Sequence, residues 1–245
     1  MVKVSLVSYL NAKPFLYGIN TCKEELNISV SLDVPSECAR KLVANEVDIG
    51  LVPVAILPTL KEKYIISDYC IGAFGKVSSV MLYSNVPLQQ IKTIVLDFQS
   101  KTSVTLVKIL AKYLWNIYPE FISAQTDNDL IANDAKAFVM IGDRTFNING
   151  KYKFEFNLAE EWFKLTQMPF VFACWVANKK LENSLIEKFN YALKVGVEKR
   201  KSMISIWQNE YAFANVEDYL MNKIRYEFGD IQKTALDTFL KYISQ

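Results

Sequence analysis

Short stretches of alternating or continuous apolar residues recur along the first two thirds of the chain. Val2, Val4 and Leu6 alternate with polar residues, which predicts a half-buried strand over 2–8. Similar or fully apolar runs predict further strands at 28–34, 48–53, 77–83, 91–97, 137–141 and 170–176.

Segments with helical start signals or a one-sided apolar pattern lie between these strands. Pro14 suits the first turn of a short helix, and Ser36 is a suitable N-cap for a helix that ends near Asn45. Asn157 and Glu160 have the spacing of a capping box. Apolar residues at helical spacing predict further helices at 104–114, 185–197, 216–226 and 231–242.

Strands that alternate with helices predict an α/β fold with a largely parallel sheet, covered by helices on both faces. The C-terminal third is mostly helical, so it must pack on a sheet formed earlier in the chain. We therefore expect two lobes, with residues 1–84 and 170–245 in one lobe, 85–169 in the other, and a substrate cleft between them.

Composition and charge narrow the class of protein. Of 245 residues, 51% are hydrophobic and 22% charged, which indicates a folded globular chain. The net charge is +2 without a charged block, so neither nucleic acid nor a membrane is an expected partner. No signal-peptide pattern and no apolar run of about 20 residues is present, which predicts a cytoplasmic protein. The cysteines are far apart and are expected to be reduced and buried: Cys22, Cys38, Cys70 and Cys174.

The chain contains no histidine, which excludes Ser-His-Asp and Cys-His catalysis. Acid–base chemistry must then use carboxylates, lysine, tyrosine, water or the substrate itself. The spacing of cysteines and carboxylates does not suit zinc, and no glycine-rich phosphate loop is present. These patterns support neither a zinc site nor a dinucleotide or nucleoside triphosphate site.

Polar residues follow several predicted strands, where ligands bind in open α/β sheets. These candidates for ligand binding are Ser8, Asn11, Ser36, Ser78, Ser79, Gly142 and Asp143. Each has a plainer interpretation as well. Asn11 could order a turn, Ser36 could simply cap its helix, and Asp143 with Arg144 could be a surface or capping pair.

The segment Ser100-Lys101-Thr102-Ser103 is the most informative of these, because it opens a helix after a strand. Free backbone N–H groups with the hydroxyls of Thr102 and Ser103 suit a carboxylate or phosphate. Simple capping by Ser100 or Thr102 is the alternative. Three aromatic residues nearer the C-terminus are interpreted as core: Trp162, Phe170 and Phe172.

An ordered set of motifs resembles the chorismate dehydratase family of the futalosine route to menaquinone. The motifs are Val7-Ser8-Tyr9-Leu10-Asn11-Ala12-Lys13-Pro14-Phe15, Val34-Pro35-Ser36, Asp48-Ile49-Gly50-Leu51-Val52-Pro53, Ser100-Lys101-Thr102-Ser103-Val104, Ile141-Gly142-Asp143, and Trp162 with Pro169-Phe170-Val171-Phe172-Ala173. The resemblance covers nearly the whole chain. It implies a type II periplasmic-binding-protein fold, with a mixed, mostly parallel sheet in each lobe.

The resemblance also implies an activity: a carbon–oxygen lyase that removes water from chorismate to give 3-[(1-carboxyvinyl)oxy]benzoate, without a cofactor. It places Asn11 at the reacting centre. Lys101 stands where the family often has arginine, which would matter if that side chain clamps a carboxylate.

Three other interpretations are open on the sequence. The fold also serves non-catalytic receptors for small carboxylates, although no leader or lipoprotein cysteine is seen. The sister family, 1,4-dihydroxy-6-naphthoate synthase, is expected to use a histidine, which this chain lacks. An effector-binding domain of a transcription regulator would need a DNA-binding motif, for which no room is seen before residue 2.

Overall fold

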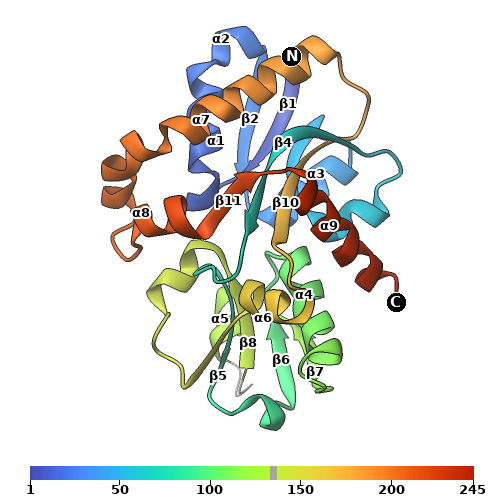
Figure 1. Cartoon of the computed structure of the whole chain (residues 1–245), viewed down its shortest axis with the longest axis vertical. Coiled ribbons are helices and arrows are strands. Elements are labelled where there is room, and N and C mark those ends of the chain that lie inside the picture. Colours follow the sequence, from blue (N-terminus) through green and yellow to red (C-terminus); the bar gives the residue numbers. More distant parts are fainter. Residues whose placement is uncertain (133–136) are drawn as a thin grey trace.

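The computed structural model describes residues 1–132 and 137–245. Its strands form two sheets, one above the other in Figure 1. The first sheet has the order β11-β4-β10-β3-β1-β2, with β1 Val2–Val7, β2 Ile28–Asp33, β3 Ile49–Pro53, β4 Tyr64–Ala73, β10 Phe170–Ala177 and β11 Ile224–Glu227. The second has the order β7-β6-β8-β5-β9, with β5 Val80–Ser84, β6 Thr93–Leu96, β7 Glu120–Ser123, β8 Ala137–Ile141 and β9 Phe154–Asn157.

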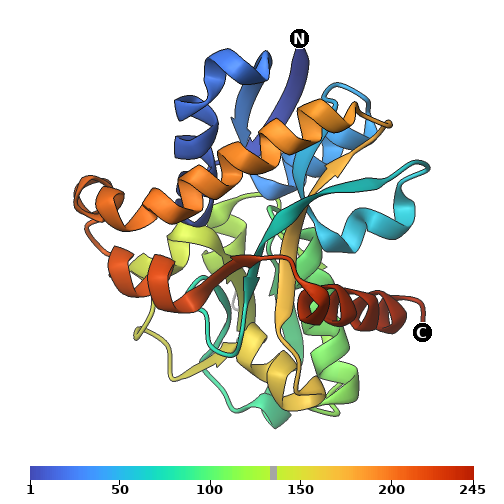
Figure 2. The same ribbon diagram turned by 45° about the horizontal axis from the view of Figure 1, so that its top comes forward.

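The helices divide between the two halves of the molecule. Around the first sheet lie α1 Lys13–Thr21, α2 Lys23–Leu26, α3 Pro35–Val43, α7 Asn183–Glu210, α8 Val216–Asp218 and α9 Asp230–Ile243. Around the second lie α4 Lys101–Tyr113, α5 Asp127–Ala132 and α6 Leu158–Thr166. Figure 2 shows the long helix α7 passing over α1 and the first sheet. No helix in the described parts of the chain is both long and apolar enough to cross a membrane.

Both sheets are mixed, as expected, but they are not mostly parallel. Within the described residues, four strand pairings are parallel and five are antiparallel. The antiparallel pairings all involve β4, β5 or β10. These strands lie where the chain leaves the first sheet and returns to it. They therefore run antiparallel to the neighbouring strands, which belong to local strand–helix–strand units or follow the return.

The first change of sheet comes earlier than residue 84, because β5 already belongs to the second sheet while β4 belongs to the first. The crossing segment is therefore 74–79. The return near residue 170 coincides with the start of β10 in the first sheet.

The prediction of a single helix at 216–226 is wrong. The chain there forms the short helix α8, a π-helical turn over Tyr219–Lys223, and the strand β11. Ile224 and Tyr226 are buried on one face of β11 while Arg225 and Glu227 are exposed. β11 pairs with β4, a strand that the sequence pattern did not reveal, so tertiary pairing decided the structure of this segment.

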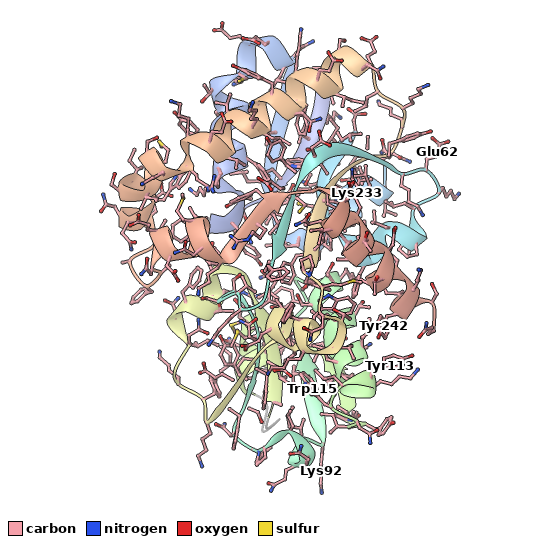
Figure 3. The ribbon with its side chains drawn as sticks, in the orientation of Figure 1. Glu62, Lys92, Tyr113, Trp115, Lys233 and Tyr242 are labelled. Atoms are coloured by element: carbon pink, nitrogen blue, oxygen red, sulfur yellow. The ribbon has the colours of Figure 1, made fainter. Side chains whose placement is uncertain are left out.

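The C-terminal helix α9 joins the two halves. Figure 3 shows Tyr242 of α9 near Tyr113 of α4, and their ring centroids lie 5.1 Å apart. Tyr242 also packs edge-on against Trp162 of α6, at 5.7 Å between centroids. Trp162 is fully buried, as its interpretation as core required.

Helices α1 and α7 cross at a contact that only glycine permits. A Cβ atom on Gly196 would lie 1.9 Å from the carbonyl oxygen of Pro14, and one on Gly18 would lie 1.9 Å from that of Ala192. Since both obstacles are backbone atoms, neither can move aside as a side chain could. This contact fixes α1, and with it the turn that precedes α1.

We predict that Gly196→Ala lowers the free energy of unfolding by about 2 kcal/mol or more, since the helices must separate to admit the methyl group. Urea unfolding of the purified variant would measure this. Gly229→Ala is the matched control, because its Cβ would meet only the side chain of Gln232 at 3.5 Å. The prediction is contradicted if both variants lose the same stability.

Candidate active site

A small cavity lies where the two sheets meet. Its volume is about 50 Å³, and its lining comes from both halves of the molecule. Five of the predicted site residues line it: Asn11, Ser79, Thr102, Ser103 and Gly142. Further lining residues that the sequence did not single out for binding include Tyr9, Pro35, Pro53, Ile71 and Phe172. Ser100, which opens the segment before α4, lines the cavity as well. The residues that line this cavity carry no formal charge.

Asn11 lies in the 3-10 turn Leu10–Ala12 between β1 and α1. The hydroxyl of Tyr226 donates to the backbone oxygen of Asn11 at 2.9 Å. The side-chain Nδ2 donates to the hydroxyl of Tyr219 at 3.5 Å. Oδ1 is buried and has no hydrogen-bond partner among the described residues. Because a buried carbonyl without a partner is costly, this oxygen is a strong candidate for contact with a ligand donor.

Helix α4 begins at Lys101, within the segment that the sequence predicted to open a helix, and its first turn lines the cavity. Ser100 is its N-cap and accepts the N–H of Ser103 at 3.0 Å. Thr102 is already engaged, because its hydroxyl donates to the oxygen of Phe172 at 3.1 Å and accepts the N–H of Ala55 at 3.3 Å. The hydroxyl of Ser103 makes no hydrogen bond within the described structure, so it is available to a ligand beside the positive end of the helix dipole.

Asp143 does not line the cavity but holds in place a turn whose residues do. Both carboxylate oxygens accept the N–H of Leu10, at 3.0 and 3.1 Å, so Asp143 holds the turn that carries Asn11. Burial raises the pKa of Asp143 to about 6, although the N–H of Leu10 and the charge of Lys13 act to lower it.

The backbone at Gly142 lies in close contact with the ring of Tyr9. The φ of Gly142 is +71°, and a Cβ atom there would lie 2.6 Å from the ring of Tyr9. Glycine is therefore required both by backbone conformation and by space. The hydroxyl of Tyr9 donates to Gln99, beyond β6, so Tyr9 links the two halves of the molecule.

The expectation of a surface or capping pair between Asp143 and Arg144 is wrong. Arg144 instead pairs with Asp97, whose side chain is fully buried, and with Asp127. Asp97 also accepts the N–H groups of Gln99 and Ile141. This network stabilises the loop after β6, which carries the segment that opens α4.

Several predicted site residues lie outside the cavity lining. Ser8 is exposed, Ser78 offers its backbone oxygen to Thr145, and Lys101 is exposed. The expected N-cap at Ser36 is wrong, because Pro35 begins the helix and Val34 occupies the cap position. The N–H of Ser36 donates to the backbone oxygen of Gln99 at 3.1 Å, so it links the two halves.

Two of the residues that sequence reasoning missed, Phe172 and Tyr219, contact the cavity or its lining side chains. Phe172, interpreted as core, is only half-buried and lines the cavity. Tyr219 lies in the segment expected to be a regular helix, and no local pattern marked it. It became recognisable only through its contacts with Asn11 and Ser79.

The four cysteines are free and buried, as expected. Burial raises the pKa of each thiol, which disfavours the thiolate that a nucleophile requires. Within the described residues no group of three or more cysteines and carboxylates is placed to hold a metal ion.

Comparison with known proteins now places the chain in a family. Residues 2–245 match the family described as Menaquinone biosynthesis. The chain belongs to this family. It is similar to the chorismate dehydratase of Thermus thermophilus, with 26% identity over 165 residues. That match spans 60% of this family member and 60% of the length of its relative.

Solved structures similar to this family member share its fold. A protein of Archaeoglobus fulgidus matches with a TM-score of 0.77 at 13% identity, covering 99% of this chain and 96% of that one. A Candida albicans gene product with the generic periplasmic-binding-protein fold matches with a TM-score of 0.72 at 11% identity, covering 100% of this chain and 90% of that one. The expected periplasmic-binding-protein fold is confirmed, and at these identities the likeness concerns the fold alone.

Proposed function

We propose that this protein is a chorismate dehydratase, a carbon–oxygen lyase that converts chorismate to 3-[(1-carboxyvinyl)oxy]benzoate and water. Membership of the menaquinone biosynthesis family and the similarity to the chorismate dehydratase of Thermus thermophilus support this function. The observation that carries it is the buried, unpaired Oδ1 of Asn11 in an uncharged cavity beside the start of α4.

The reaction suits a site without a strong acid or base. Chorismate loses the proton on ring C3 and the hydroxyl on C4, and the ring becomes aromatic, so the driving force is large. The site must hold the dianion, orient it and exclude water. An uncharged cavity closed by both halves of the protein can do all three.

Asn11 is assigned an orienting role, because an amide is not basic near neutral pH. The enolpyruvyl carboxylate of the substrate, or a water, takes the C3 proton. The C4–O bond then breaks with its electron pair on oxygen, and the departing hydroxide and the released proton together give water. The Oδ1 of Asn11 accepts a hydrogen bond from the C4 hydroxyl and so fixes the ring.

The two carboxylates of chorismate would be bound without a paired lysine or arginine in the cavity lining. The N-terminus of α4 supplies backbone N–H groups and a positive dipole end, and Ser103 adds a free hydroxyl. Since dipoles cost less to desolvate than a mobile ammonium group, they can hold a carboxylate in a dry site.

A cavity of about 50 Å³ has room for a few water molecules, but it is far smaller than the roughly 300–1,000 Å³ of pockets that hold small ligands. Substrate entry therefore requires the two halves to separate. The hydrogen bonds that join them are few and mostly involve loops, for example Ser36 with Gln99 and Leu10 with Asp143. Periplasmic-binding-protein folds can open by a hinge of this kind.

The test is to incubate the purified protein with chorismate and follow ultraviolet absorbance and product mass. We expect the loss of one water with the enolpyruvyl group retained on an aromatic ring. Tight binding of chorismate without turnover would indicate a receptor, a role also found on this fold: the aliphatic sulphonate binding protein of Escherichia coli matches with a TM-score of 0.59 at 12% identity, covering 99% of this chain and 92% of that one. If the protein neither binds chorismate nor turns it over, the proposed function is overturned.

A further inference from the structure

Three polar side chains form a hydrogen-bonded chain beside the cavity. The hydroxyl of Tyr219 lies 2.6 Å from Oγ of Ser79 and accepts from Nδ2 of Asn11 at 3.5 Å. Ser79 belongs to the segment that enters the second sheet, whereas Asn11 and Tyr219 belong to the half built on the first. Tyr219 comes from the π-helical turn after α8, a type of turn found frequently at functional sites.

The direction of this chain follows from counting protons. Nδ2 of Asn11 can only donate, so the phenol oxygen of Tyr219 accepts from it. The single phenol proton must then be donated elsewhere, and Ser79 is the partner that the described structure provides. If Ser79 accepts this proton, its own hydroxyl proton is left for the cavity, which Ser79 lines.

Tyr219 is held firmly enough to impose this direction. The residue is 2% exposed, and its ring packs edge-on against Phe146 with centroids 5.1 Å apart. Burial raises the pKa of Tyr219 further above the neutral range, so the phenol stays protonated in any ordinary assay.

We propose that Tyr219 is a positioning residue that presents Asn11 as an acceptor and Ser79 as a donor to the substrate. This inference rests on the proposed function. The C4 hydroxyl of chorismate needs both groups, because its proton requires an acceptor and its oxygen gains charge as the C–O bond breaks. Without the phenol, the amide of Asn11 is free to turn and the hydroxyl of Ser79 loses its fixed direction.

The kinetic test compares Tyr219→Phe with the control Tyr83→Phe. Tyr83 is also a buried tyrosine, but its hydroxyl donates to Asn149 in the second half of the protein, away from the cavity lining. Tyr219→Phe should lower kcat for chorismate about tenfold or more with KM changed less than about threefold, because the lost interaction orients the reacting hydroxyl. Tyr83→Phe should keep both constants. An unchanged kcat in Tyr219→Phe would overturn the proposal.

A second measurement needs no substrate. The side-chain amide signals of Asn11 and Asn149 are recorded by ¹⁵N NMR in the full chain and in both variants. Tyr219→Phe should shift the amide of Asn11 and leave Asn149 in place, and Tyr83→Phe should do the reverse. An Asn11 signal unmoved by Tyr219→Phe would refute the hydrogen-bond chain. If the wild-type protein does not turn over chorismate, the proposed function fails, while this measurement still decides the role of Tyr219.

Discussion

Replacing Asn11 by alanine should lower kcat for chorismate by about 100-fold and change KM by less than about threefold. The reason is that Oδ1 of Asn11 contacts the reacting hydroxyl, whereas the carboxylates of the substrate are bound at the start of α4. Removing Oδ1 leaves the anion site intact but lets the ring move relative to the group that takes its proton. Steady-state kinetics on the purified variant would measure both constants.

The matched control is Asn178→Ala. The amide of Asn178 bonds to backbone oxygens of Leu42 and Val47 at the far end of the first sheet, and it does not line the cavity. This variant should lose stability and keep wild-type kcat. If Asn11→Ala retains kcat within about twofold, a mechanism that depends on orientation by Asn11 is wrong.

Asp143→Asn should make the protein more stable at pH 7.5, by up to about 3 kcal/mol, and should change its stability little near pH 3.5. Burial raises the pKa of Asp143 from its ordinary value near 4 to about 6. A raised carboxyl pKa means that the folded state holds its proton more tightly, so stability is lost as the pH rises from about 4 through about 6. Asparagine avoids this cost and keeps an oxygen for the N–H of Leu10.

The titratable groups around Asp143 are consistent with a raised pKa of its carboxyl group. Lys13 favours the charged form, but it is itself paired with Glu210 at 2.6 Å. The phenols of Tyr211 and Tyr219 lie near enough for the charge of Asp143 to raise their pKa. Among the described residues, no lysine or arginine other than Lys13 lowers the pKa of Asp143. Urea unfolding of wild type and variant at several pH values would give the difference directly.

Asp33→Asn is a control for which the expected change in stability at neutral pH has the opposite sign. Burial alone would raise the pKa of Asp33, but hydrogen bonds from Lys41, Ser31 and Ser5 hold it below its ordinary value. Asp33→Asn should therefore destabilise the protein at pH 7.5 and have less effect near pH 3.5. If both variants change stability in the same direction at neutral pH, the account of Asp143 fails.

The stability cost that we expect of the Asp143 carboxylate at neutral pH has an explanation in function. Asp143 accepts the N–H of Leu10 from the other half of the molecule, and this bond fixes the turn on which Asn11 lies. The same bond helps to keep the cavity closed, so the stability cost accompanies the positioning of Asn11.

Local signals in the sequence were sufficient wherever an element depends on its own residues. Apolar runs marked β1, β2, β3, β6, β8 and β10, and Ser100 and Asn157 cap α4 and α6 as the spacing indicated. The absence of histidine by itself limits the chemistry open to the site. These inferences succeed because strand alternation, capping and side-chain chemistry act over a few residues.

Tertiary structure decided the rest. Tyr64–Ala73 and Ile224–Glu227 become neighbouring strands across more than half of the chain, and no short-range pattern encodes that pairing. The change of side-chain environment that distinguishes Asp143 from a surface carboxylate, and Tyr219 from a core tyrosine, arises only when the two halves meet. The sequence by itself determined the fold class, the candidate residues and the start of α4. The closed cavity, in contrast, depends on contacts between residues as distant in the chain as Asn11 and Tyr219. The reason is that burial and hydrogen-bond partners are properties of the assembled molecule.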